Sequence, residues 1–481
     1  MPLYYFTPQD VLFFRDSRPM EANVGSGGHG ASWPSPSVFF DALHAAFWRA
    51  YPNEEPWEDR HRFGRSSKRD PNLNRTKRFG ALRTAGPFPV LDKDWLFSCP
   101  GDVTHADDSS LQVLRPLLGD IGSSNLPSDW LFPLASVSQP SKEAPAAWWS
   151  KAAVESYLAA QPPPRGALHS RDRLFQAEWS TGIGRNADTR TQDGERIYSA
   201  EYLRLRPGVR IGLHADLTLR RDGSEGMGKL FNGAGCVVVG GQQRVCQVEA
   251  AHHLSLAAVL PLGLQDGQIT GPRVKWVLLS PAVWPEIKNV SETGVPQCTA
   301  QGESIVRHSG GWLPNWICPS TGRVLLKQGD TTRADDRSRG DWRARVRALP
   351  AFSEATRLVA ARVPKPQVIT GWSDELHLDD PDESRRSAGP KPTHLAVPAG
   401  AVYYFECANT GEAVALASAL NWHGNTPGAG IKNRRSTLFG EKGFGLGVCG
   451  HWEPVGIPSR GWASVTSESP QQQPSVSSRP L

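Results

Sequence analysis

The sequence is poor in cysteine, and it contains no long uninterrupted run of apolar residues. Seven cysteines in 481 residues, with no Cys-x-x-Cys pair, predict a protein of a reducing compartment that needs no disulfides. Cys236 and Cys246 are expected to be ordinary core thiols. No stretch reaches the roughly 18 apolar residues of a membrane span, and residues 1–19 lack the features of a secretory signal. We therefore expect a cytoplasmic protein with no membrane partner.

The chain also lacks a strong charge of either sign, because 53 Lys and Arg residues stand against 48 Asp and Glu residues. Such a small excess does not indicate a polyanionic partner. The evidence for such a partner must come from where the basic residues cluster. A chain of 481 residues exceeds what one hydrophobic core usually fills, which predicts two or more domains. Many short strand-like runs and few long helical periods predict a mixed α+β fold.

Local patterns predict individual elements of this fold. Residues 2–15 read as two short strands around a turn at 7–10, because apolar and aromatic residues flank Pro8 on both sides. Residues 36–50 predict a helix, with Ser35 or Ser37 at its N-cap and an apolar face. Three β-rich runs predict further strands, at residues 235–241, 275–281 and 401–406.

Two glycine-rich segments imitate phosphate-binding motifs. The stretch EKGFGLGVCGHW, at residues 441–452, contains a G-x-G-x-x-G string, but Pro454 and Pro458 forbid the helix that a dinucleotide site needs next. The stretch GSEGMGKL, at 223–230, has Leu230 where a phosphate loop needs Ser or Thr, so a glycine-rich turn is expected. No nucleotide cofactor is predicted.

The glycines of the first segment still require an explanation. Gly443, Gly445 and Gly447 fit two interpretations: bare main-chain amides that bind an anion, or a strand packed tightly against a helix. Three cations, Lys432, Arg434 and Arg435, lie just upstream in the sequence. Cations beside a bare glycine loop favour a sugar-phosphate chain, although the packing interpretation stays open.

A second candidate site lies at residues 180–208, where two alternating segments flank the turn-forming stretch RNADTRTQDGE. This pattern predicts a long β-hairpin with a basic, hydroxyl-rich tip. Such a hairpin can contact phosphates through Arg and Thr and wedge between bases through Ile197, whereas a solvated surface hairpin is the alternative. The loop at 60–83 has nine Lys or Arg residues and one acid, so both solvation and RNA contact stay open there.

Several motifs follow one another in the order of a known family. They are PQDVLFFRDSRPM at 8–20, PSVFFDAL at 36–43, EWSTGIGRNADTRTQDGERIYSAEYLRL at 178–205 and GEKGFGLGVCGHW at 440–452. On these motifs the chain resembles the third subunit of the type III-B (Cmr) CRISPR effector complex, a member of the RAMP superfamily. The resemblance covers most of residues 3–452.

This resemblance implies an α+β fold of two ferredoxin-like (RRM-like) domains with long insertions and a projecting β-hairpin thumb. The domains would span residues 1–235 and 236–462, and a disordered tail would follow at 463–481. The implied role is non-catalytic and uses no cofactor: the subunit holds the 5′ tag of the CRISPR RNA. Its implied partners are the large polymerase-like subunit and the backbone RAMP subunit, with target RNA contacted indirectly.

The residues and the resemblance together give a set of predicted RNA contacts. These are Arg15, Arg18, Ser37, Arg185, Asn186, Thr189, Arg190, Thr191, Ile197, Tyr198, Arg204, Lys432, Arg434, Arg435, Gly443, Phe444, Gly445 and Gly447. The chain departs from the family pattern in its first-helix block, where Asp41 replaces a glycine, His44 a basic residue and Val38 a hydroxyl. Gln242 stands where the family has glutamate, so a salt bridge expected there is lost.

Two other function classes are possible. RAMP relatives include endoribonucleases that cut RNA without metal, for which His29 or His451 would be the general acid or base. No partner base stands at a recognisable spacing, and no Cys and His set predicts a zinc site. An assembly-only subunit is the third class, since 17 tryptophans and the stretch AAWWSKAAVESYL at 146–158 would serve interfaces, although core packing is their commoner use.

Overall fold

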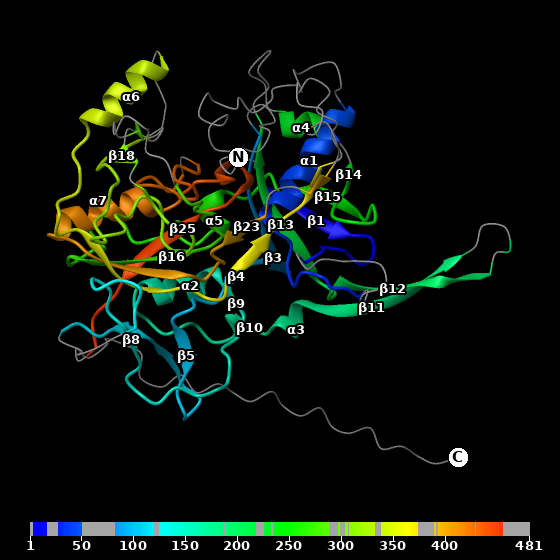
Figure 1. Ribbon diagram of the computed structural model, residues 1–481, viewed down its shortest axis with the longest axis horizontal. Helices are drawn as coiled ribbons and strands as arrows, with labels where there is room; N and C mark the ends of the chain where they lie inside the picture. The colour runs from blue at the N-terminus through cyan, green and yellow to red at the C-terminus, as the bar shows by residue number, and fades with distance from the viewer. Residues whose placement is uncertain are drawn as a thin grey trace.

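The computed structural model describes residues 3–16, 27–50, 82–119, 125–185, 189, 191–217, 226–231, 235–287, 297–298, 304–305, 307–331, 338–373, 389–390, 393–428 and 430–455. The described part is a strand-rich mixture of α and β structure with few helices. Two β-sheets with packed helices form its body, and one long hairpin projects from that body (Figure 1).

The larger sheet has eight antiparallel strands in the order β10-β9-β4-β3-β13-β1-β15-β14. Their bounds are β1 Leu3–Pro8, β3 Arg83–Leu91, β4 Asp94–Ser98, β9 Trp148–Ser150, β10 Leu168–His169, β13 Val209–Asp216, β14 Gly235–Val238 and β15 Val245–Ala250. Helix α1, Pro36–Ala50, packs on this sheet because Phe39, Leu43 and Phe47 recur on one face and are buried.

The smaller sheet has four antiparallel strands in the order β19-β24-β16-β25. Their bounds are β16 Arg273–Leu278, β19 Arg357–Arg362, β24 Val402–Glu406 and β25 Gly447–His451. Helix α7, Thr410–Leu420, packs against it and is capped by the Asn409 side chain, which accepts from the Glu412 N–H. Trp276 and Tyr403 fill the core below, with ring centroids 5.8 Å apart.

The remaining elements are short and connect or extend these sheets. The other helices are α2 Lys151–Leu158, α3 Arg171–Leu174, α4 Gly226–Leu230, α5 Leu256–Val259, α6 Arg339–Ala348 and the 3₁₀ turn η3 Gly440–Lys442. The other strands are β2 Gly27–Gly28, β5 Val103–His105, β6 Leu111–Val113, β7 Arg115–Pro116, β8 Leu134–Ala135, β11 Phe175–Arg185, β12 Gln192–Leu205, β17 Gln297–Cys298, β18 Ser304–Ile305, β20 Gln367–Ile369, β21 Trp372–Ser373, β22 Gly389–Pro390 and β23 His394–Ala396. None of the described helices is long and apolar enough to cross a membrane.

A buried polar cluster joins helix α2 and the segment after β4 to the smaller sheet. The carboxylate of Asp102, which is fully buried, accepts from the hydroxyl of Tyr157 on α2 at 2.6 Å and from that of Tyr404 on β24 at 2.6 Å. The ammonium of Lys275 on β16 lies 3.4 Å from the Tyr157 ring centroid, and burial lowers its pKa to about 8. A buried carboxylate is tolerated only when such donors satisfy it, so this cluster fixes α2 against the smaller sheet.

The sequence predicted several of these elements correctly. The helix at 36–50 is confirmed, as are the strands within 235–241, 275–281 and 401–406. Of the two strands predicted within residues 2–15, only the first, β1, is present. In place of the second, Leu12 and Arg15 make isolated bridges to Leu203 and Gly30.

Three other expectations differ from the structure. The predicted glycine-rich turn ends in the short helix α4, whose Met227 packs in the core. Cys246 is buried as expected, whereas Cys236 is exposed. Cys246 lies opposite Val237, the neighbour of Cys236, so the two cysteine side chains are on opposite faces of the sheet. The predicted domain boundary after residue 235 falls within the larger sheet, since β14 and β15 pair onto β1. The ferredoxin-like character of the domains stays a prediction, and the predicted tail lies outside the described residues.

Candidate nucleic-acid interface

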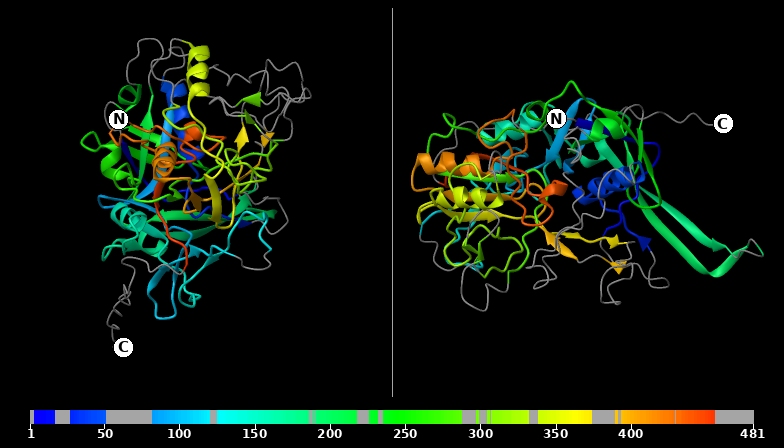
Figure 2. Two further views of the ribbon diagram at one scale, coloured as in Figure 1. Left: turned by 90° about the vertical axis from the view of Figure 1, so that its left-hand side faces the viewer. Right: turned by 90° about the horizontal axis from the view of Figure 1, so that it is seen from above.

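The predicted hairpin is a two-stranded antiparallel ribbon made of β11 and β12. The strands pair without interruption from Phe175 opposite Leu205 to Ile183 opposite Ile197, and the register shifts before Arg185 meets Gln192. Figures 1 and 2 show the ribbon leaving the body of the molecule as a long arm. The arm thus begins five residues before the predicted start at 180 and ends three before the predicted end at 208.

The far end of the arm carries hydroxyl groups. Thr189 and Thr191 are exposed, and their Oγ1 atoms lie 2.8 Å apart. The backbone of Arg185, Ile197 and Tyr198 belongs to the paired strands, and their side chains lie outside what the structure describes. The predicted contacts Asn186, Arg190 and Arg18 are also outside the described residues, as is most of the basic loop at 60–83.

At its root the arm is anchored to the N-terminal residues. β2 pairs in parallel with β12 at Ser199 and Ala200, and Leu12 bridges Leu203. The predicted contact Arg15 is exposed here, where its backbone bridges Gly30. The structure therefore brings Arg15 to the base of the arm, although the two are far apart in the sequence.

On one face of the arm the charged groups are already paired. The guanidinium of Arg204 donates to the Glu178 carboxylate and, at 3.2 Å, to Asp10, and the first of these bonds lowers the pKa of Glu178. Two carboxylates thus occupy Arg204, which disfavours its predicted role as an RNA contact. Gln242 forms no salt bridge, but its amide oxygen accepts from the Tyr202 hydroxyl at 2.7 Å and from Arg244 at 3.3 Å.

The opposite face presents an aromatic ring that the sequence interpretation overlooked. Trp179 on β11 is 52% exposed and lies directly opposite Glu201 on β12. The ring of His29 stands edge-on to the indole, at 90° and 5.5 Å between centroids. His29 Nδ1 is 3.7 Å from the Glu201 carboxylate, which also accepts the Gly30 N–H at 3.2 Å. A tryptophan alternating with polar residues on a strand was the signal that could have located this face.

The segment at residues 440–447, called the glycine loop below, differs from its predicted form. The N–H of Gly445 donates to the Pro281 carbonyl at 2.7 Å, that of Gly443 to the Gly440 carbonyl at 3.1 Å, and that of Phe444 to the Phe439 carbonyl at 3.3 Å. The Phe444 side chain is fully buried. The expectation of bare amides that bind an anion is therefore wrong for these three residues, because protein carbonyls already accept from them.

Close packing explains why glycine is needed in this loop. Gly443 and Gly445 have φ values of 101° and 75°, in the left-handed region that favours glycine. A Cβ on Gly445 would lie 2.0 Å from the Ser436 nitrogen, and one on Gly447 would lie 2.3 Å from Trp276 Nε1. The alternative of tight packing thus describes the loop.

The cations upstream of the loop also bind the protein's own carbonyls. Arg434 donates to the Thr84 and Gly440 carbonyls, and burial together with the nearby Arg83 lowers its pKa. Arg435 is buried, and its Nε donates to the Ala419 carbonyl at 2.7 Å. Lys432 is half-buried. Two of the three predicted cations therefore hold the loop in place rather than present themselves to a phosphate.

Asp41, which replaces a glycine of the family pattern, contacts a residue of this loop. The buried ammonium of Lys442 donates to the Asp41 carboxylate of α1 at 2.6 Å and lies 4.9 Å from the Phe40 ring centroid. The glycine loop is thereby tied to α1. The predicted contact Ser37 is half-buried in the same helix, and its hydroxyl is 3.1 Å from that of Ser35.

The two histidines of the nuclease hypothesis lie in different settings. His29 belongs to the root of the arm, whereas His451 ends β25, and its Nε2 is 2.8 Å from the Gln268 carbonyl oxygen. General acid–base cleavage needs two proton-transfer groups at one centre. His29 contacts Glu201 and His451 contacts Gln268, so neither contact brings the two histidines together. Within the described ranges, no group of three His, Cys, Asp or Glu residues is placed to hold a metal ion.

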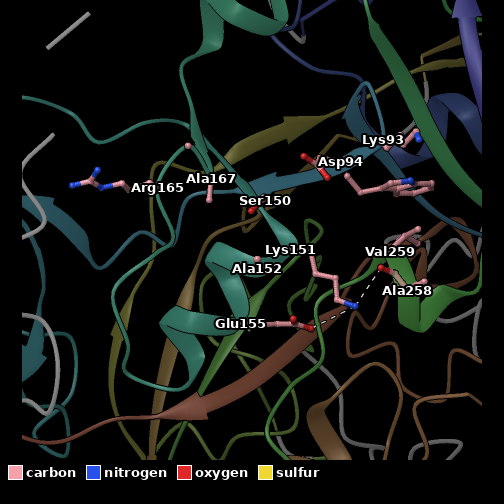
Figure 3. Close-up of a pocket in the computed structure, with 12 residues that line it drawn as sticks. Lys93, Asp94, Ser150, Lys151, Ala152, Glu155, Arg165, Ala167, Ala258 and Val259 are labelled. Atoms are coloured by element: carbon pink, nitrogen blue, oxygen red, sulfur yellow. Dashed lines mark hydrogen bonds and ion pairs between the residues drawn. The ribbon is translucent and has the colours of Figure 1, made fainter. Parts of the chain in front are cut away.

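A shallow hollow of about 400 Å³ opens beside the start of α2 (Figure 3). It is lined by three cations, Lys93, Lys151 and Arg165, and by two acids, Asp94 and Glu155. The Lys151 ammonium points to the backbone of α5, where it donates to the Ala257 and Ala258 carbonyls, and lies 3.7 Å from Glu155 (Figure 3). With nearly balanced charges and its central lysine occupied, the hollow offers little to a polyanion.

Comparison with known proteins identifies the family. The sequence model of the Cas_Cmr3 family, described as CRISPR-associated protein (Cas_Cmr3), matches residues 4–452. The chain belongs to the Cas_Cmr3 family. That match covers the arm, the glycine loop and both sheets of this Cas_Cmr3 protein. No curated protein matches it.

Solved structures show only distant likeness to this Cas_Cmr3 chain. A chain of the type III-B Cmr-beta complex bound to cognate target RNA and AMPPnP, in state 1, is 10% identical with a TM-score of 0.39, and the match covers 84% of this chain and 86% of that one. A chain of Cmr-beta bound to cognate target RNA is 11% identical with a TM-score of 0.36, at the same coverages. A chain of the type III-A Csm3–Csm4 subcomplex is 10% identical with a TM-score of 0.30, covering 85% and 94%. Family membership rests on the sequence model and not on these scores.

Proposed function

We propose that this Cas_Cmr3 protein is a non-catalytic RNA-binding subunit of a type III-B CRISPR effector complex. In this role the arm formed by β11 and β12 holds the single-stranded 5′ tag of the CRISPR RNA. The body joins the large polymerase-like subunit to the backbone RAMP subunit, and the target RNA is contacted indirectly. Membership of the Cas_Cmr3 family supports the assignment to a CRISPR system.

The observation that carries the proposal is the projecting arm. Its strands pair from Phe175 to Ile183 and again at Arg185, so a two-stranded ribbon leaves the body (Figure 1). The segment between the two strands carries the exposed Thr189 and Thr191. Hydroxyl and guanidinium groups are the usual partners of phosphate oxygens, and they position a nucleic acid without reading its sequence. A projecting ribbon with such an end can offer phosphate-binding groups to a flexible ribose-phosphate strand.

The alternatives receive less support. The amides of Gly443, Phe444 and Gly445 and the upstream Arg434 and Arg435 are bonded to protein carbonyls, which disfavours an RNA contact through the glycine loop. A metal-independent nuclease would bring an acid and a base together, whereas His29 and His451 contact unrelated groups. An assembly-only role would use the tryptophans of 146–158 at interfaces, but Trp149 is fully buried in the core.

A salt titration of RNA binding tests the proposal. The double variant Arg185→Ala, Arg190→Ala is compared with the unchanged protein, using a labelled single-stranded RNA and the full chain. Each lost phosphate contact removes roughly 0.7 from the slope of log K against log salt on a single strand, so the slope should fall by about 1.4. Affinity at low salt should fall as well.

A matched control separates this effect from a general loss of charge. Arg343 and Arg347 are exposed on α6, which Figure 1 shows on the side of the molecule away from the arm. The variant Arg343→Ala, Arg347→Ala loses the same two charges and should keep the slope within about 0.3. Unchanged affinity and slope in the arm variant would contradict the assignment, and a cleaved RNA product would favour the nuclease class.

A further inference from the structure

The hydrophobic residues exposed on this molecule include one aromatic ring on the arm whose role is not explained by packing. Trp179 is 52% exposed, although a tryptophan of the core such as Trp149 is fully buried. It lies on the face of the ribbon formed by Ala177, Trp179 and Thr181 of β11, opposite Leu203, Glu201 and Ser199 of β12. We call this the Trp179 face.

We propose that Trp179 is a stacking platform for one base of a single-stranded RNA at the root of the arm. This inference rests on the proposed function, and it adds a contact away from the tip. Base–aromatic stacking is the recurrent way in which proteins hold single strands, because every base has a π-face. An exposed indole on a rigid strand supplies that surface with little loss of side-chain freedom.

The surroundings of the ring hold it in place without covering it. The imidazole of His29 packs edge-on at 5.5 Å, which fixes the indole from one side. Glu201 fixes His29 in turn, since its carboxylate lies 3.7 Å from Nδ1 and also accepts the Gly30 N–H. These contacts leave more than half of the Trp179 side chain exposed, so the ring is oriented before any ligand arrives.

The polarity of the neighbours favours a nucleic acid over a protein as the occupant. On the Trp179 face the neighbours of the ring along β11 are the exposed Ala177 and Thr181, and the cross-strand partner is the half-buried Glu201. A contiguous exposed apolar patch would indicate a protein-docking surface, and exposed apolar side chains are instead adjacent at Val368 and Leu395, which pair across β20 and β23. A single flat ring among hydroxyls and charges matches a base with its ribose and phosphate.

Two exposed arginines lie near the root of the arm, where the Trp179 face begins. Arg171 is exposed and lines a small surface hollow together with Gly30, Ala177 and Glu201. Arg15 is exposed where its backbone bridges Gly30. In this arrangement the base lies over the indole and the phosphates of the strand lie near the Arg171 guanidinium, which offsets the charge of the neighbouring Glu201 carboxylate.

An abasic scan tests this contact directly. The full-length protein, its Trp179→Ala and Trp179→Phe variants and the control Leu395→Ala are titrated with a fluorescein-labelled single-stranded RNA. The same RNA is then used with one base removed at each position in turn. We expect Trp179→Ala to weaken binding about 5- to 100-fold, Trp179→Phe to recover most of the loss, and Leu395→Ala to have no effect.

The scan also reports which nucleotide stacks on the ring. One abasic position should weaken binding to the unchanged protein, and the same position should have no further effect in Trp179→Ala, because the two changes remove one contact. An identical abasic profile and affinity in Trp179→Ala would overturn the stacking proposal and leave the tip contacts standing. Absence of RNA binding by the unchanged protein at low salt would overturn the proposed function and this inference together.

Discussion

The glycine loop at 440–447 and the arm at 175–205 carry similar sequence signals and have opposite structures. Both combine glycine with an aromatic residue, and arginines lie within the arm and, as Arg434 and Arg435, just upstream of the loop; both were predicted to contact RNA. In the loop the Gly445 amide and the Arg435 guanidinium bond to protein carbonyls inside the body. In the arm the Thr189 and Thr191 hydroxyls and the Trp179 ring face outward.

The difference shows that glycine and arginine in a sequence indicate that another group lies close to the backbone. They do not indicate whether that group belongs to the protein itself or to another molecule. In the loop the approaching group is the protein itself, because a Cβ on Gly443 would lie 3.1 Å from the Thr84 carbonyl oxygen of β3. In the arm the ribbon leaves the body, so its outward groups are available to another molecule (Figure 2). Burial separates the two cases, and burial depends on contacts that are distant in sequence.

The largest effect is expected from a side chain added inside the loop. Gly445→Val should destabilise the protein by about 3–5 kcal/mol, because it combines left-handed strain with overlap on the Ser436 backbone. Gly428→Ala is the matched control, since Gly428 is exposed and nothing lies within 4 Å of an added Cβ. Denaturant midpoints measure both variants. A folded Gly445→Val protein with impaired RNA binding would restore the loop as a contact site.

The body should also respond to pH through a buried histidine. His423 is fully buried and accepts the Gly263 N–H at 3.1 Å, and burial lowers its pKa to about 4 from the usual 6.5. The unfolded chain therefore binds the proton more tightly, so stability is full above pH 6.5 and falls as the pH drops towards 4. The loss is at most about 3 kcal/mol.

The variant His423→Gln isolates this contribution, because glutamine can accept the same N–H without titrating. Its denaturant midpoint should vary less between pH 6.5 and 4 than that of the unchanged protein. An equally steep pH dependence in both proteins would assign the effect to other groups.

The ion pair between the loop and α1 should contribute a smaller amount. Asp41→Ala leaves the buried Lys442 ammonium without this carboxylate, and a loss of about 1–3 kcal/mol is expected. Asp41 is 44% exposed, so water offsets part of the loss. Thermal unfolding measures the change, and a shift indistinguishable from zero would show that the loop does not depend on this contact.

The smallest effect is expected on the arm. Glu178→Ala removes the carboxylate partner of Arg204, yet both side chains are about 40% exposed, so the stability should change by less than about 1 kcal/mol. The same variant removes one of the two carboxylates that pair with Arg204 and leaves Asp10, which should raise the affinity for RNA slightly at low salt. A loss of stability as large as that of Asp41→Ala would show that the ion pairs of the arm stabilise the fold as much as those of the loop, and would contradict the contrast between the exposed arm and the packed loop.

The sequence predicted local structure better than it predicted surroundings. The spacing of Phe39, Leu43 and Phe47 defined helix α1, and the turn-forming stretch between alternating segments defined the arm, because both signals lie within a short window. The partners of Arg434 could not be predicted, since Thr84 is distant in the sequence and only the folded chain brings the two together. Trp179 was overlooked although Glu178 and Ser180 flank it, because a tryptophan is more often a core residue and its exposure depends on the fold around the strand.

The central claim is that the arm, and not the glycine loop, contacts the RNA. Ultraviolet crosslinking of the full chain to a single-stranded RNA with photoreactive bases, followed by peptide mapping, tests it most directly. We predict crosslinked peptides from residues 171–206 and none from residues 440–450. Crosslinks concentrated at 440–450, with the arm unlabelled, would contradict the account.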